Sequence, residues 1–434
     1  MEFQLLPGGV ISGEARVPGD KSISHRSIML GALAEGTTRV SGFLEGEDAL
    51  ATVAAFRALG VAIEGPEDGE VAVHGVGLHG LRAASAPLDM GNSGTSMRLL
   101  AGLLAGQGFA SELTGDVSLC KRPMGRVIDP LRLMGASIDG SAEGRPPLRV
   151  QGGKTLQGIH YDLPMASAQV KSCVLLAGLY AEGRTSVTEP APTRDHTERM
   201  LRGFGYDVRN DDGVISLEGG GRLQATEIDV PADISSAAFF LVAASIAPGS
   251  DLLLTHVGIN PTRVGVINIL QLMGADITLK NHREVGGEPV ADIHVRHAPL
   301  AGIEIPLDQV PLAIDEFPVL FIAAACATGR TVLRGAEELR VKESDRIAAM
   351  AEGLTTLGVH NEVLEDGIII DGGSLGGGVI HTYHDHRIAM SFAIAALRAS
   401  EEIRILDCDP VGTSFPGFDA LARGLGLQIT ARVD

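Results

Sequence analysis

A helical segment that ends in an apolar residue followed by glycine occurs six times in this chain of 434 residues. The copies read FRALG, LRLMG, LRGFG, LQLMG, LTTLG and ARGLG, with glycines at Gly60, Gly135, Gly205, Gly274, Gly358 and Gly426. Each glycine predicts a left-handed residue just past a helix, and an apolar, strand-like stretch follows in all copies but the fifth. A repeat of about 70 residues is typical of a repeat architecture.

A second helix, rich in Ala, Leu and other small residues, precedes each of these segments. The six read SISHRSIMLGALAEG, SGTSMRLLAGLLAGQG, SAQVKSCVLLAGLYAEG, ISSAAFFLVAASIAPG, DEFPVLFIAAACATG and DHRIAMSFAIAALRAS. Because they are apolar on nearly all sides, we expect these helices to be buried. Strand-like runs flank both helices, so each unit is predicted to contain strand, buried helix, strand, outer helix, strand and strand. Six units form an α/β protein, divided into two domains of three units.

Composition limits the possible partners. The net charge of −19 argues against nucleic acid and anionic membranes, which both require a basic surface. The four scattered cysteines suggest neither a disulfide framework nor a metal site. The sequence contains no apolar run of membrane-spanning length and no secretion signal, so we expect a cytoplasmic protein.

Polar residues cluster where the first three buried helices are expected to begin. Lys21 and Ser22 open the first, with Ser22 as its expected N-cap and Arg26 one turn later. Backbone N–H groups, the helix dipole and two cations would then form an anion site. The second and third helix heads offer uncharged donors: Asn92, Ser93, Gly94, Thr95 and Ser96 in one, Ser167 and Gln169 in the other. Ordinary helix caps and turns are the alternative interpretation of each head.

Cations and carboxylates form further groups before other helices. They are Lys121, Arg122 and Arg126; Arg194, Asp195 and His196; Asp315 and Glu316; Lys342, Glu343, Asp345 and Arg346; and His384, Asp385, His386 and Arg387. These groups supply both halves of general acid/base chemistry, although acids at a helix start are also ordinary caps.

Other motifs in the sequence fail on their spacing. GDKS lacks the spacing of a phosphate-binding loop, and GVGLHG is followed by Pro87 instead of a long helix. The histidines of HTYHDHR lack an i, i+4 pair, so no metal site is predicted. Cys120 beside two cations is either an activated nucleophile or an ordinary structural cysteine.

Eight runs of this chain resemble the motifs of the 5-enolpyruvylshikimate-3-phosphate synthase family, in the family's order and over nearly the whole chain. They are PGDKSISHRSIML, GNSGTSMR, CKRPMGR, SAQVKS, IDEFPVL, LRVKESDRI, DHRIAMSFAIA and SFPGF. The resemblance implies an inside-out α/β barrel of two domains, each with three βαβαββ units. It also implies domains of residues 20–230 and of 1–19 plus 231–434, with hinges near 19–21 and 229–233.

The reaction implied by this resemblance transfers the enolpyruvyl group of phosphoenolpyruvate to the 5-hydroxyl of shikimate 3-phosphate and releases phosphate. It proceeds by addition and elimination through a tetrahedral intermediate. The resemblance further implies a monomer that needs no cofactor and no metal. The shikimate pathway, which leads to chorismate and the aromatic amino acids, is the implied context.

The resemblance also assigns roles to residues of this chain. Shikimate 3-phosphate would be bound by Lys21, Ser22, Arg26, Ser167, Ala168, Gln169, Arg194, Asp315 and Lys342. Phosphoenolpyruvate would be bound by Lys21, Gly94, Thr95, Arg122, Gln169, Arg346 and Arg387, with Asn92 and His386 in support. Our hypothesis for proton transfer makes Asp315 the base toward the hydroxyl and Glu343 the acid/base at the methylene carbon, with Lys21 assisting.

Two alternatives remain open at this stage. One is the related enolpyruvyl transferase that acts on UDP-N-acetylglucosamine, which has a Lys-Asn pair where this chain has Lys21 and Ser22, and a cysteine where it has Val117. The other is a non-catalytic repeat protein that binds phosphorylated metabolites, which would gain nothing from Asp315 and Glu343 among cations.

The chain also departs from the family pattern at two positions. Thr413 replaces a common Lys and Ala168 a common Ser. Arg194 and the RDHTE run resemble the family's more divergent branch. In glyphosate-insensitive relatives within the family, a methyl group at the position of Gly94 narrows the pocket. Because Gly94 carries no such group, the resemblance implies inhibition by glyphosate.

Overall fold

The computed structural model describes residues 1–432. The chain forms two compact units. The central unit comprises Gly19–Val230 and the short segment Val285–Gly287. The terminal unit comprises Met1–Pro18, Pro231–Glu284 and the chain from Glu288 onward. Within residues 1–432, no helix combines the length and the apolar content needed to cross a membrane.

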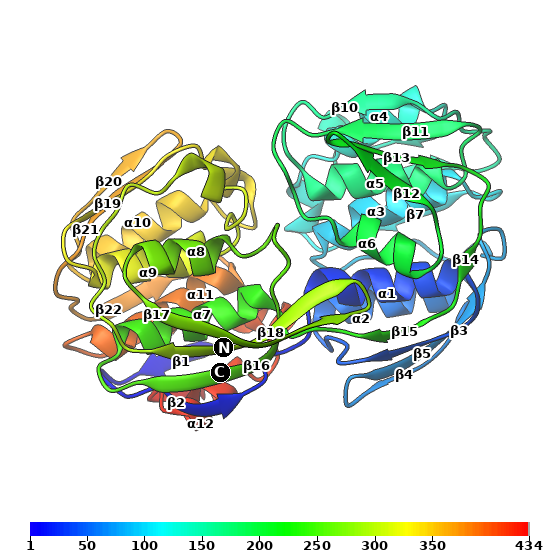
Figure 1. Ribbon diagram of the computed structural model, residues 1–434. Helices are drawn as coiled ribbons and strands as arrows, with labels where there is room; N and C mark the ends of the chain where they lie inside the picture. The colour runs from blue at the N-terminus through cyan, green and yellow to red at the C-terminus, as the bar shows by residue number, and fades with distance from the viewer. Residues whose placement is uncertain (433–434) are drawn as a thin grey trace. The chain divides into compact units, whose positions relative to one another are not determined.

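The central unit contains three buried helices, each paired with an outer helix later in the chain (Figure 1). The buried helices are α1 (Lys21–Leu33), α3 (Gly94–Ala105) and α5 (Ala168–Gly178). The outer helices are α2 (Glu47–Ala58), α4 (Gly125–Leu133) and α6 (His196–Gly203). Helix α3 packs against α5, and α6 packs against α1. The side chains of these buried helices supply much of one hydrophobic core.

Three sheets surround these helices. In the second and third sheets, the strand before the buried helix pairs in parallel with the strand after it. In the first sheet, strands from residues 223–229, near the end of the unit, take that place. An antiparallel hairpin completes each sheet. The first sheet contains β3 (Ala34–Ser41), β4 (Ala62–Glu67), β5 (Glu70–Val76), β14 (Leu223–Gln224) and β15 (Glu227–Asp229). The second contains β6 (Leu88–Asp89), β7 (Ser111–Thr114), β8 (Ser137–Asp139) and β9 (Leu148–Gln151). The third contains β10 (His160–Asp162), β11 (Arg184–Thr188), β12 (Val208–Asp211) and β13 (Val214–Glu218).

The terminal unit repeats this arrangement. Its buried helices α7 (Ile234–Ile246), α9 (Phe317–Cys326) and α11 (His386–Ala395) pack against one another (Figure 1). Its outer helices are α8 (Gly265–Leu272), α10 (Arg346–Thr356) and α12 (Phe418–Leu425). Every residue of α7 is buried, as its all-round apolar sequence predicts.

The N-terminal strands complete two sheets of the terminal unit. Strand β1 (Glu2–Leu5) pairs with β23 (Ile403–Leu406) and β24 (Ile429–Arg432), beside β22 (Gly378–His381). Strand β2 (Ser12–Ala15) pairs in parallel with β16 (Asp251–Gly258), next to β17 (Asp276–Val285) and β18 (Glu288–Arg296). The third sheet contains β19 (Arg330–Leu333), β20 (Asn361–Leu364) and β21 (Gly367–Asp371). Residues 1–15 therefore act as repeat strands of units that lie more than 200 residues away in sequence.

The predicted α/β architecture of βαβαββ units is confirmed. All six repeat glycines have positive φ angles, between 80° at Gly205 and 118° at Gly426. The fifth copy, which no apolar stretch follows, also leads into a strand, β20 (Asn361–Leu364), as the prediction of six equal units requires. The sequence of β20, NEVL, is too polar to be recognised as an apolar run. Its antiparallel pairing with β21 stabilises the strand in place of an apolar sequence of its own.

Candidate active site

The first helix head of the central unit is capped by Asp20, and not by Ser22 as predicted. The Asp20 carboxylate accepts a hydrogen bond from the backbone N–H of Ile23 at 2.9 Å, so α1 already begins at Lys21. Ser22 therefore lies in the first turn of the helix, where its carbonyl accepts from Arg26 at 2.9 Å. The Lys21 ammonium forms an ion pair with Asp48 of α2.

Arg26 is almost fully buried, and its described partners in this unit are neutral. Its Nε donates to the Thr197 hydroxyl at 2.7 Å, and Nη2 donates to the Ser172 hydroxyl at 3.0 Å. Thr197 and Ser172 also bond to each other at 2.7 Å. A guanidinium held by hydroxyl groups in this way presents a fixed set of N–H donors, of the kind that suits carboxylates and phosphates.

The head of α3 brings two predicted residues together. Asn92 donates to Asp116 at 2.8 Å and accepts from Arg122 Nη2 at 2.6 Å, so it links the turn before α3 to the segment before α4. Ser93 caps α3 by accepting from the Ser96 N–H at 3.1 Å. A methyl group at Gly94 would lie 3.2 Å from Nη1 of Arg122, so the absence of a side chain there leaves room for the arginine.

Arg98 is a polar residue of this site that the sequence analysis did not single out. Its Nη1 donates to Gln169 Oε1 at 2.6 Å, and Gln169 Nε2 donates to the Thr95 hydroxyl at 2.9 Å. The heads of α3 and α5 are therefore joined through predicted residues and Arg98. The sequence did contain a signal for Arg98: it is a cation four residues after Gly94, one helical turn further along α3.

The remaining predicted residues of the central unit lie at or before helix starts. Ser167 caps α5 by accepting from the Val170 N–H at 3.4 Å, and Ala168 is the first residue of that helix. Arg194 lies, partly buried, in the loop immediately before α6.

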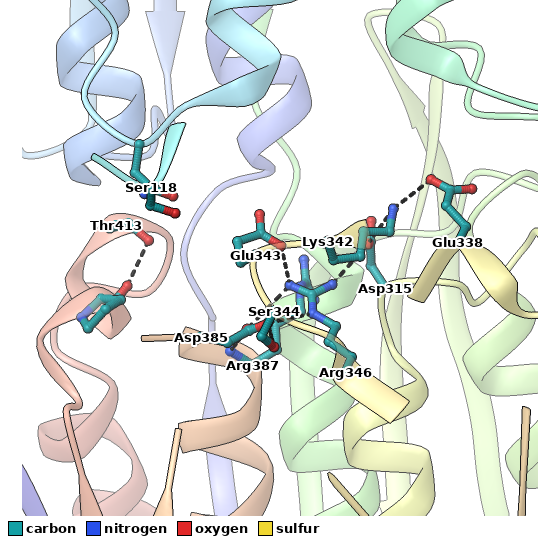
Figure 2. A network of polar contacts seen from close by, with 12 residues as sticks. Ser118, Asp315, Glu338, Lys342, Glu343, Ser344, Arg346, Asp385, Arg387 and Thr413 are labelled. Carbon is teal, nitrogen blue, oxygen red and sulfur yellow. Dashed lines mark hydrogen bonds and ion pairs between the residues drawn. The ribbon is translucent and has the colours of Figure 1, made fainter. Parts of the chain in front are cut away.

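Arg346, the first residue of α10, is the centre of the terminal unit's cluster (Figure 2). Only 1% of its side chain is exposed. Its guanidinium contacts Asp385 at 2.8 Å, Glu343 at 2.6 Å and Asp315 at 3.3 Å. Ser344 also donates to Asp385, at 2.9 Å. One buried cation is thus held by three carboxylates.

These contacts shift the pKa values of both partners in the direction of the charged forms. Burial opposes the charge of Arg346, but Asp385, Glu343 and Asp315 outweigh it and raise the arginine's pKa. Burial likewise favours neutral Asp385, yet the Arg346 charge holds the pKa of this carboxyl below its usual range. Asp385 also caps α11 by accepting from the Arg387 N–H at 2.9 Å.

Lys342 extends the cluster toward a further acid. Its ammonium lies 3.4 Å from Asp315 and 2.8 Å from Glu338. Burial lowers the pKa of Lys342, but the Asp315 and Glu338 carboxylates raise it by more. Asp315 therefore lies between two cations, Lys342 and Arg346.

The other predicted residues of the terminal unit lie around the head of α11. His386 is buried as the first residue of the helix, and Arg387 lies 4.0 Å from Glu316. Glu316 in turn accepts from the Ser235 hydroxyl at the head of α7. Thr413 donates to the Pro410 carbonyl at 2.7 Å and supplies no charge (Figure 2).

The fold and these helix heads define a class: a two-unit α/β protein of βαβαββ repeats, with cationic and polar side chains at helix starts and carboxylates in contact with cations. The sequence matches the EPSP synthase (3-phosphoshikimate 1-carboxyvinyltransferase) family over residues 6–421. The chain belongs to this family.

Individual relatives agree with this assignment. The chain is 68% identical to the 3-phosphoshikimate 1-carboxyvinyltransferase of Alkalilimnicola ehrlichii, covering 99% of this chain and 97% of the relative. The enzyme of the same name from Methylococcus capsulatus is also 68% identical, with 98% of each chain covered. The structure resembles EPSP synthase from Acinetobacter baumannii with a TM-score of 0.90 at 62% identity, over 99% of each chain. The enolpyruvyl transferase NikO from Streptomyces tendae shares the fold, with a TM-score of 0.78 at 18% identity over 99% of this chain and 98% of that chain.

Proposed function

We propose that this protein transfers the enolpyruvyl group of phosphoenolpyruvate to the 5-hydroxyl of shikimate 3-phosphate and releases phosphate. The observation that carries the proposal is the contact of two carboxylates, Asp315 and Glu343, with the buried cation Arg346, in a chain that belongs to the EPSP synthase family. The reaction needs proton acceptors and donors beside cations that hold acidic substrates, and this cluster contains both.

The cations at the helix starts of the central unit support binding of the two anionic substrates. We assign shikimate 3-phosphate to Lys21, Ser22, Arg26, Ser167, Ala168, Gln169 and Arg194, with Asp315 and Lys342 from the terminal unit. We assign phosphoenolpyruvate to Lys21, Gly94, Thr95, Arg122 and Gln169, with Arg346 and Arg387, and with Asn92 and His386 in support. Planar guanidinium groups suit both the carboxylates and the phosphates of these substrates.

Proton transfer is assigned to three residues. Asp315 takes the proton of the 5-hydroxyl while the hydroxyl oxygen bonds to C2 of phosphoenolpyruvate, and Glu343 delivers a proton to the methylene carbon C3. A tetrahedral intermediate results. In the second step C3 returns a proton to Glu343 and the C2–O bond to phosphate breaks, which restores the double bond. The proton held by Asp315 leaves with the released phosphate. Lys21 assists by stabilising developing negative charge. No step requires a cofactor or a metal.

Groups of both units take part in this reaction. We therefore propose that the two chain crossings, near residues 19–21 and 229–233, act as hinges between the domains 20–230 and 1–19 plus 231–434. The protein would act as a cytoplasmic monomer.

The direct test is phosphate release from phosphoenolpyruvate with shikimate 3-phosphate as acceptor, run in parallel with UDP-N-acetylglucosamine. We expect release only with shikimate 3-phosphate. Release with the nucleotide sugar would replace the proposed activity by that of the related transferase. Ligand binding without release in either assay would instead indicate the non-catalytic repeat protein considered from sequence.

A further inference from the structure

A buried lysine outside the proposed substrate contacts lies next to them in sequence and in space. Lys171 of α5 has 1% of its side chain exposed, and its ammonium lies 2.8 Å from Glu198 of α6 and 3.0 Å from Glu189. The side chains of both carboxylates are also buried, with 4% and 9% exposed. The three residues, called here the Lys171 triad, place one cation between two anions inside the central unit.

Stability alone does not account for this triad. Removing charges from water is costly, and well-packed apolar residues often stabilise a protein equally well or better than a buried ion pair. One oxygen of Glu198, Oε2, has no hydrogen-bond partner within residues 1–432, so one buried polar atom of the cluster is left without the hydrogen bond that would offset its burial. A buried charge cluster of this kind is more readily explained by the geometry that it enforces.

The triad fixes the elements that orient Arg26. Lys171 and Ser172 are consecutive on α5, and Thr197 and Glu198 are consecutive on α6, so two adjacent contacts set the position of one helix against the other. The Ser172 and Thr197 hydroxyls are also the groups that accept hydrogen bonds from the Arg26 guanidinium, at 3.0 and 2.7 Å. A shift of α6 relative to α5 would therefore turn this guanidinium.

The triad also anchors the loop that carries Arg194. Glu189 begins this loop, and its carboxylate accepts from Lys171 at 3.0 Å and from the hydroxyl of Thr193, the residue just before Arg194. Pro190 and Pro192 restrict φ between these two anchored points. The loop is therefore held at both ends of the segment Glu189–Thr193.

We propose that Lys171 is a positioning residue for the shikimate 3-phosphate site, acting through Arg26 and Arg194. This inference rests on the proposed function, because it concerns the substrate assigned to those two arginines. Lys171 itself does not contact the substrate. Its charge holds the α5–α6 contact and the loop in the arrangement that lets both guanidinium groups meet one anionic ligand.

The experiment measures binding of shikimate 3-phosphate to the full chain by calorimetry, together with the KM values for both substrates. Lys171→Met leaves two buried carboxylates unpaired and can impair folding. The triple variant Lys171→Met/Glu189→Gln/Glu198→Gln removes all three charges and avoids that problem. For each folded variant we expect the dissociation constant of shikimate 3-phosphate to rise about tenfold or more. The KM for phosphoenolpyruvate, measured at saturating shikimate 3-phosphate, should change by less than about threefold.

A control in the same helix separates positioning from stability. Leu176 is a buried apolar residue of α5, five residues after Lys171, so Leu176→Ala should lower the melting temperature without weakening shikimate 3-phosphate binding. A double-mutant cycle with Thr197→Val adds a second criterion. If Lys171 acts through the Thr197–Arg26 contact, the variant with both substitutions should bind shikimate 3-phosphate with about the same affinity as whichever single variant binds it less tightly.

The outcomes are distinct for the two proposals. Unmodified protein that does not bind shikimate 3-phosphate would remove the proposed function. Unmodified protein that binds, with triad variants that melt earlier but bind equally well, would overturn the positioning role alone. Additive losses in the cycle with Thr197→Val would overturn it as well.

Discussion

The two units use the same repeat, but among their described contacts three arginines of the central unit and two of the terminal unit have different kinds of partner. In the central unit, Arg26 donates to hydroxyls, Arg98 to the Gln169 amide and Arg122 to the Asn92 amide. In the terminal unit, the cations face acids: Arg346 contacts three carboxylates, and Arg263 pairs with Asp233 at 2.9 Å. The repeat therefore determines where side chains lie, and the residues at each helix start determine the chemistry.

Under the proposed function, this difference assigns different roles to the two units. Guanidinium groups that donate to neutral oxygens bind an anionic substrate, whereas Arg346 holds the carboxylates that transfer protons. We therefore expect substitutions in the central unit to weaken anion binding, and substitutions in the terminal unit to impair proton transfer or folding. On the central side, Lys21, which pairs with Asp48, and Lys171, which pairs with Glu189 and Glu198, are exceptions.

The largest effect is expected from Asp315→Ala. Removing this carboxylate from between Lys342 and Arg346 eliminates the proposed base for the 5-hydroxyl, so kcat should fall by about a thousandfold, roughly 4 kcal/mol. The dissociation constant of shikimate 3-phosphate should change much less. Steady-state kinetics and calorimetry provide the two measurements. Asp308→Ala, which removes an exposed carboxylate nearby in the chain, should leave both values unchanged. A kcat within threefold of the parent would exclude Asp315 from the mechanism.

The second prediction tests the charge environments directly by comparing Arg346→Met with Arg26→Met. Arg346→Met leaves three carboxylates without their shared cation, which should cost about 3–5 kcal/mol of unfolding free energy. Arg26→Met leaves hydroxyl and carbonyl partners, at a cost of about 1–3 kcal/mol. Urea titration of both variants gives the two values. Equal losses would mean that the difference in partners between the units has no energetic consequence.

Gly94→Ala tests how closely the central unit's arginines are packed. The added Cβ would lie 2.8 Å from Arg98 Nη1 and 3.2 Å from Arg122 Nη1, so at least one guanidinium must move. We expect the KM for phosphoenolpyruvate to rise about tenfold, or roughly 1.4 kcal/mol of lost binding. Glyphosate, expected to compete with phosphoenolpyruvate in the parent, should lose more affinity than the substrate does.

The control for this substitution is Gly125→Ala, at the start of α4. A Cβ at Gly125 would meet no atom within 4 Å, so neither the KM for phosphoenolpyruvate nor the affinity for glyphosate should change. Absence of competition between glyphosate and phosphoenolpyruvate at millimolar inhibitor in the unmodified protein would contradict the interpretation of Gly94.

The repeats could be predicted because their signals are local. A glycine after an apolar residue at a helix end is specific, and all six adopt the expected left-handed geometry. The N-cap of α1 was misplaced by two residues because Asp20 and Ser22 are equally good caps by composition. Local chemistry thus identifies the helix start but not its exact first residue.

The partners within each site could not be predicted, because they come from distant parts of the chain. Arg26 meets Ser172 and Thr197, which lie 146 and 171 residues away. Arg98 was overlooked because it lies within a helix interpreted as apolar, and its function becomes visible only through Gln169, 71 residues later. The difference between neutral and acidic partners therefore emerged only from the tertiary structure.

The smallest expected effect concerns the order in which the units lose stability as pH falls. His25 is buried in the central unit, bonded to the Thr52 hydroxyl at 2.8 Å and the Ser96 hydroxyl at 3.2 Å. Burial, with the charges of Lys21 and Arg26, lowers its pKa well below 6.5. The unfolded chain therefore binds a proton below pH 6.5 that the folded chain refuses, and stability falls by up to about 1.4 kcal/mol per pH unit.

Asp385 in the terminal unit behaves differently. Arg346 overcomes the effect of burial and lowers the pKa of this carboxyl below its ordinary value of 3.8. Its contribution to stability is complete above that value and is lost only as the pH falls through the lower, folded-state pKa. Between pH 6.5 and 5, the central unit alone should therefore lose stability from these two groups.

Urea titrations of the parent and His25→Gln at pH 7, 6 and 5 test this order. The variant should lose about 1–2 kcal/mol less than the parent over that range, because it has no imidazole to protonate on unfolding. His282→Gln, which removes an exposed histidine, should follow the parent. A parent and a His25→Gln variant with parallel pH profiles would show that His25 accepts its proton in the folded state, and that the cationic surroundings in the central unit are weaker than the contacts imply.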